Sequence, residues 1–145
     1  MIRECTEASF AIGEEQTADQ RRLALGHFLA HAHHLERRIA RSLEYHLEAC
    51  LQLARSGPAD AVQKVLEDEY KHVEYTGLAL PELLTHSEHT AIMELHARGE
   101  EQANLVFSSI QVQRFLASYA DHVSVPSRLL YRFGSWLMAR RSEHV

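Results

Sequence analysis

The chain has 145 residues, with 15 Lys and Arg against 20 Asp and Glu, a formal net charge of -5 and a pI near 6.1. This length allows one domain with a sizeable core, and the acidic balance gives no electrostatic reason to expect a nucleic-acid or anionic-membrane partner. Neither a signal peptide nor an uncharged apolar run of about 18 residues occurs, so we expect a cytoplasmic protein without a membrane span.

The composition is that of a helical protein. It is rich in Leu, Ala, Glu, Arg and Gln, contains only three prolines and six glycines, and shows no sustained alternation of apolar and polar residues. We therefore predict an all-α fold in one domain over residues 1–145, with an irregular segment over residues 1–16.

The first helix is expected to begin at a cap formed by Thr17 or Asp19 and to end at Arg55, before the Ser-Gly-Pro sequence at 56–58. A second helix should begin near Pro58 and run to about Leu80, where the following proline breaks or kinks it. Because their connection is short, these two helices must be antiparallel neighbours.

The third helix is expected to begin between Pro81 and Ser87 and to reach about Asp121, with Gly99 as a weak point. Residues 123–126 then separate it from a final helix over 127–141. Four helices joined in this way predict an antiparallel, up-down-up-down four-helix bundle.

Two acidic residues lie on apolar helix faces. At about 100° per residue, Glu36 falls near the centre of the apolar face of the first helix, and Glu69 does so on the second, with His72 one turn further along. A buried, unpaired carboxylate costs several kcal/mol, so both need a proton, a base or a cation. The apolar residues of the two faces are Leu25, Leu29, Ala32, Ile39, Leu43, Leu47 and Cys50, and Val62, Val65, Leu66, Val73, Thr76 and Leu80.

Glu36, a gap of 32 residues and then Glu69-Tyr70-Lys71-His72 resemble the first half of the di-iron motif of the ferritin-like superfamily. Rubrerythrins, bacterioferritins and p-aminobenzoate N-oxygenases share this arrangement, and Asp68-Glu69-x-x-His72 is similar to the N-oxygenase form. The resemblance covers residues 20–80. It implies a terminal carboxylate from Glu36, a metal-bridging carboxylate from Glu69 and an imidazole ligand from His72.

The second half of that motif has no counterpart, because no second Glu-x-x-His occurs and the last helix has no carboxylate between Ser127 and Arg141. Glu94 on the third helix is the best-placed additional ligand, and Glu88 and Glu101 are alternatives for a shifted turn. A partner chain is another source, as the resemblance to encapsulated ferritins implies, since their subunits build the site across an interface. The third possibility is that the motif is a remnant that binds no metal.

Two alternatives do without this centre. In one, Glu36 and Glu69 form buried salt bridges with Arg98 or with histidines of the bundle. In the other, the histidines bind metal as in hemerythrin-like bundles, because His27, His31 and His34 share one stripe and His89 and His96 share another. The first of these stripes is rotated away from the apolar face, so an exposed histidine-rich surface is the simpler expectation.

The sequence thus predicts a ferritin-like protein with two iron ions, or manganese as the alternative, bound through Glu36, Glu69 and His72 and held within one chain or shared between chains. The resemblance implies oxidation or oxygenation of a small molecule with oxygen or peroxide. The long helices favour a homodimer. The alternative function is a non-catalytic helical protein, either an iron-binding or storage relative or an interaction module.

Overall fold

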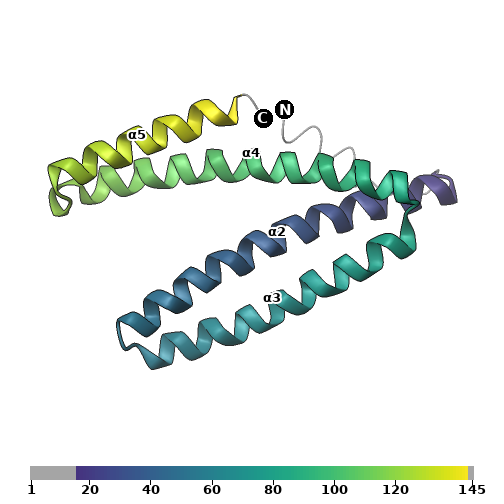
Figure 1. Ribbon diagram of the computed structural model, residues 1–145, viewed down its shortest axis with the longest axis horizontal. Helices are drawn as coiled ribbons and strands as arrows, with labels where there is room; N and C mark the ends of the chain where they lie inside the picture. Colours follow the sequence, from purple (N-terminus) through teal and green to yellow (C-terminus); the bar gives the residue numbers. More distant parts are fainter. Residues whose placement is uncertain (1–15, 144–145) are drawn as a thin grey trace. The chain divides into compact units, whose positions relative to one another are not determined.

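The computed structural model describes residues 16–143, which are helical almost throughout (Figure 1). The helices are α2 (Ala18–Gln52), α3 (Ser56–Leu83), α4 (His86–Tyr119) and α5 (Val125–Ser142), with a short 3-10 helix η1 (Ala120–His122) before α5. The predicted all-α class is confirmed. The irregular segment predicted over residues 1–16 lies outside the described residues except for Gln16.

The described helices fall into two compact units, one reaching to His96 and the other beginning at Ala97, so α4 contributes its first turns to unit 1 and the remainder to unit 2. The closed four-helix bundle and the single domain stay predictions. None of the helices in residues 16–143 combines the length and apolarity that crossing a membrane requires.

Local sequence signals set the helix starts. The Thr17 hydroxyl accepts a hydrogen bond from the Gln20 amide at 3.2 Å, and the Gln20 side chain accepts one from the Thr17 amide at 2.8 Å, which is a reciprocal capping box. Thr85 and Glu88 repeat this exchange at the start of α4, at 2.9 and 3.4 Å. Ser124 caps α5 through the Ser127 amide. The predicted cap at Thr17 is confirmed.

The predicted break of the second helix after Leu80 is wrong, because α3 continues through Pro81 to Leu83. A proline inside a helix removes one backbone donor and crowds the carbonyl four residues earlier. Packing outweighs this cost here. Leu80, just before the proline, is fully buried, and Leu84, at the end of the helix, is 6% exposed, so the core holds the last turn on both sides of Pro81.

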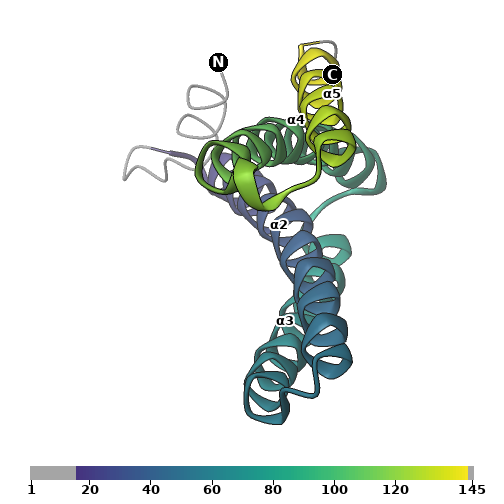
Figure 2. The same cartoon turned by 90° about the vertical axis from the view of Figure 1, so that its left-hand side faces the viewer.

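In unit 1, α2 and α3 lie side by side as an antiparallel pair (Figures 1 and 2). Small residues on α2 allow this close approach, and a Cβ atom at Gly26 would lie 2.7 Å from Leu84 Cδ2. Several large residues of the predicted apolar face are only half-buried, and Leu25 is 40% exposed, because one neighbouring helix covers only part of that face. The core cluster consists of Ala30, Leu80, Leu84 and Ile92, with Leu23, Leu29, Leu83 and Met93 packed against it.

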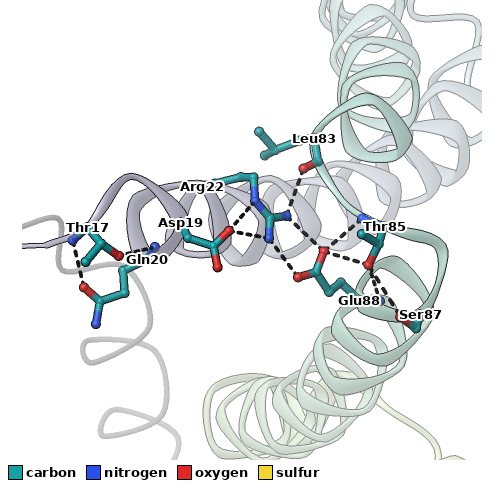
Figure 3. Close-up of polar contacts among 8 residues, drawn as sticks. All are labelled: Thr17, Asp19, Gln20, Arg22, Leu83, Thr85, Ser87 and Glu88. Atoms are coloured by element: carbon teal, nitrogen blue, oxygen red, sulfur yellow. Dashed lines mark hydrogen bonds and ion pairs between the residues drawn. The ribbon is translucent and has the colours of Figure 1, made fainter.

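A polar cluster ties the start of α2 to the turn between α3 and α4 (Figure 3). The Arg22 guanidinium donates two hydrogen bonds to the Glu88 carboxylate, at 2.8 and 2.9 Å, and a third to the Leu83 carbonyl at 3.1 Å. These bonds, with those from Thr85, hold the pKa of Glu88 down at about 2. Glu88 is therefore committed to a structural ion pair.

In unit 2, the later part of α4 and α5 also run antiparallel, since Gln102 bonds Ser142 while Ser109, further along α4, bonds Ser135, earlier on α5. Ser109 and Ser135 are both 3% exposed, each donates to the other's carbonyl oxygen, and Gln113 bonds both hydroxyls. Large apolar residues remain exposed around this narrow seam: Val106, Phe107, Ile110, Phe115, Tyr119, Leu129, Leu130, Tyr131, Phe133, Trp136 and Leu137.

Candidate metal centre

Three of the four predicted metal ligands come together in unit 1. Glu36 lies in the middle of α2, and Glu69 and His72 lie one turn apart on α3, a spacing that places both side chains on one helix face. One ligand atom from each of the three lies within 4.8 Å of the other two. The prediction that both acids face one seam is confirmed.

The group is buried on one side and open on the other. The side chains of Glu69 and Glu36 are 15% and 24% exposed, whereas His72 is 60% exposed. His72 Nδ1 lies 3.9 Å from Glu69 Oε2 and 4.0 Å from Glu36 Oε1, which is too far for hydrogen bonds. The two acids thus occupy the seam, and the imidazole stands at its open edge.

The electrostatics of the pair favour a cation. A hydrogen bond to Glu69, burial and the negative charge of Glu69 together raise the pKa of Glu36, while His72 opposes them weakly. Glu69 Oε2 is buried and has no hydrogen-bond partner among the described residues. A buried carboxylate oxygen left in this way costs stability unless it gains a proton or a metal. The donor set fits a metal on this ground.

The chemistry of the donors narrows the choice of ion. Two carboxylates are hard anionic ligands, and one imidazole supplies a nitrogen of intermediate softness. This mixture suits iron or manganese and is poorer in nitrogen and sulfur than structural zinc sites, and the identity of the metal stays a prediction.

The remaining predicted acids are not brought to this group. Glu94 is exposed on α4 and does not belong to it. Glu88 pairs with Arg22, and Glu101 pairs with Arg141 at 2.7 Å within unit 2. Of the basic groups that the salt-bridge alternative offered, a bundle histidine, His72, is the one that approaches both acids, at the edge of ion-pair distance.

An open groove of about 450 Å³ lies beside the group. Arg37 and Tyr70 connect the two, because they directly follow Glu36 and Glu69 in the chain and line the groove. Tyr70 is 48% exposed and donates a hydrogen bond from its hydroxyl to Glu44 at 2.6 Å. The regular spacing of charged residues on α2 was the signal in the sequence that could have located this groove. The other lining residues are Ala40, Arg41, Glu44, Tyr45, Glu48 and Val73.

The expected exposed histidine surface on α2 is wrong. His27 and His31 pack against His96 of α4, and His34 Nε2 lies 3.1 Å from the Met93 carbonyl oxygen. His96 is 8% exposed. The stripe is covered because the first turns of α4 return alongside α2 within unit 1, which the helical projection of α2 alone does not include.

Comparison of the chain with protein-family models, with curated proteins and with solved structures gave no significant match in any of the three.

Proposed function

We propose that this chain is a ferritin-like helical protein that binds a non-haem iron or manganese centre through Glu36, Glu69 and His72 and oxidises a small molecule with oxygen or peroxide. The observation that carries the proposal is the convergence of the three ligand atoms within 4.8 Å around a buried carboxylate oxygen that has no hydrogen-bond partner in residues 16–143. When bound, the metal supplies the redox chemistry that amino-acid side chains lack.

The residues have separate tasks. Glu36 and Glu69 hold the cation in the seam. Because metal ligands must be deprotonated, binding releases the proton that the raised pKa of Glu36 favours on the carboxylate pair. His72 adds an imidazole nitrogen at the open edge, where its side chain is 60% exposed and can adjust its position. The nearby groove, whose lining includes Ala40 and Val73 one turn beyond Glu36 and Glu69, would hold a small molecule close to the cation.

A second copy of the chain completes the centre in this proposal. The chain alone contributes three donors, and Glu94, Glu88 and Glu101 stand elsewhere. Two-fold symmetry would supply an identical set from the partner and close an antiparallel four-helix bundle around it. The support is the open edge at His72 together with half-buried and exposed apolar residues on α2 and α3, such as Leu25 and Val65.

The test is the metal content of the untagged full chain, purified anaerobically, by elemental analysis together with mass by light scattering. We expect about one or two irons or manganeses per chain in a dimer, and loss of this metal in Glu69→Ala. Glu67→Ala is the matched control, because it removes the same charge from an exposed position of α3. Equal metal content in wild type and Glu69→Ala would overturn the proposal.

The second candidate is a non-catalytic helical protein, which binds or stores iron or serves as an interaction module. The observation favouring it is that the described residues form a group of only three donors, one of them largely exposed. Oxygen consumption after addition of ferrous iron separates the two functions: the oxidase consumes oxygen repeatedly with a reductant present, and the non-catalytic protein does not.

A further inference from the structure

Histidines of α2 and α4 form a second cluster, which shares no residue with the Glu36, Glu69 and His72 group. His27 Nδ1 lies 3.1 Å from His96 Nε2, and their ring centroids are 5.3 Å apart. The ring of His31 stands 5.8 Å from that of His96. His96, at the centre of this cluster, is 8% exposed, so three imidazoles meet at a largely dry position.

We propose that His27, His31 and His96 bind a divalent transition metal of the zinc class, at a site separate from Glu36, Glu69 and His72.

The spacing of the nitrogens suits such an ion. With metal–nitrogen bonds of about 2.0–2.1 Å and tetrahedral angles, two imidazoles on one zinc ion place their nitrogens about 3.3–3.4 Å apart. The present 3.1 Å between His27 and His96 needs a shift of only a few tenths of an ångström. The hydrogen now held between these two nitrogens moves to the outer nitrogen of its own ring, so both imidazoles bind as neutral ligands.

His31 supplies the third donor from the same helix as His27. Histidines at i and i+4 lie one above the other on a helix face, a spacing that lets both rings reach one ion. Within residues 16–143 the acidic group is the one whose ligand atoms already meet the 4.8 Å distance, so His31 has to rotate toward His96. Its side chain is half-buried, with its ring 5.8 Å from that of His96.

The protonation state of the cluster also favours metal binding. Burial and the neighbouring histidines lower the pKa of His96 to about 4, and burial lowers the pKa of His27. Both rings are therefore neutral near pH 7, which is the form that coordinates metal. Three nitrogen donors without a carboxylate select zinc, copper or nickel, whereas the acidic group suits iron or manganese.

The test uses Zn²⁺ and Co²⁺ alone as probes, added to the untagged full chain carrying Glu69→Gln so that the acidic group is disabled. We expect one Zn²⁺ per chain by calorimetry, and a visible Co²⁺ band of the intensity typical of four-coordinate sites. In His27→Gln/His31→Gln the affinity should fall at least about tenfold, with loss of the band.

The matched control is His46→Gln/His86→Gln, which removes two exposed histidines from the same two helices. It should leave Zn²⁺ affinity and the Co²⁺ band unchanged. Equal weakening by the two double variants would overturn the proposal by showing scattered surface binding, and so would retention of tight binding in His27→Gln/His31→Gln. Circular dichroism of each variant confirms that helix content is retained. Iron content of the chain without Glu69→Gln tests the acidic group independently.

Discussion

The two units of this protein fill their seams with different chemistry. In unit 1 the seam of α2 and α3 holds an aliphatic cluster at one end, where Leu80 is fully buried, and the Glu36/Glu69 pair further along. In unit 2 the most buried contact of α4 with α5 is a hydroxyl pair, Ser109 and Ser135. Among the described residues, the seam of unit 1 thus contains titratable groups, whereas the seam of unit 2 buries a pair of neutral hydroxyls.

The two units are therefore stabilised by different interactions. Aliphatic burial is worth about 25 cal/mol per Å², whereas a neutral hydrogen bond contributes about 1 kcal/mol net. A hydroxyl pair adds little to stability but fixes which residues face each other. Unit 2 leaves its large aromatic residues exposed, among them Phe133 at 59% and Trp136 at 50%. The three candidate metal ligands, Glu36, Glu69 and His72, lie in unit 1.

The largest effect should come from the aliphatic cluster. Leu80→Ala removes a fully buried side chain and should lower the free energy of unfolding by about 2–5 kcal/mol. Leu78→Ala, on the same helix at 64% exposure, should change it by less than about 0.5 kcal/mol. Urea unfolding followed by circular dichroism measures both. Equal effects would show that the seam of α2 and α3 is not the stabilising core.

A second effect concerns the buried histidine of unit 1. Because the pKa of His96 is lowered to about 4 in the folded chain, the unfolded chain binds more protons below pH 6.5. The contribution of neutral His96 to the free energy of unfolding is fully present above pH 6.5 and is lost as the pH falls toward about 4. Between pH 7 and pH 5 the free energy of unfolding should fall by about 2 kcal/mol.

Urea unfolding at pH 7 and pH 5, with EDTA present to keep metal away, measures this loss. His96→Phe should flatten the dependence, since it removes the titrating group and keeps a ring of similar size. His46→Gln, an exposed control, should keep it. An equally steep pH dependence in His96→Phe would assign the loss to other groups.

A smaller effect tests the hydroxyl pair of unit 2. Ser109→Ala removes a buried donor to the Ser135 carbonyl and should cost about 1 kcal/mol. Ser108→Ala gains the same helix propensity at a half-buried position and should be neutral or slightly stabilising. A double-mutant cycle of Ser109→Ala with Ser135→Ala isolates the coupling between the hydroxyls. Strict additivity would contradict a paired seam.

The smallest effect distinguishes the acidic pair from its surroundings. The raised pKa of Glu36 means that the folded chain holds this proton more tightly than the unfolded chain, so stability falls as pH rises through the carboxyl range. Glu36→Gln should therefore stabilise the metal-free protein at pH 7, by less than about 1 kcal/mol. Thermal unfolding in EDTA measures it, with Glu48→Gln, an exposed acid of α2, as control.

The sequence by itself determined the helical class and most helix limits, because these depend on local chemistry. The Thr17 cap, the start of α3 at the Ser-Gly-Pro sequence and the one-turn spacing of Glu69 and His72 are all short-range signals, and the structure contains each of them. The inward placement of Glu36 also followed from helical periodicity alone.

Which residues are buried between helices depended on the tertiary structure, because helical periodicity does not show how helices pack against one another. Pro81 stays within α3 because Leu80 and Leu84 are packed in a core that involves residues of α2 and α4. The histidine stripe of α2 is covered because α4 returns alongside it. His96 lies 69 positions after His27 in the chain and yet approaches it to hydrogen-bond distance. A helical projection gives the direction of each side chain, but burial depends on which other helix lies there, and long-range packing determines that.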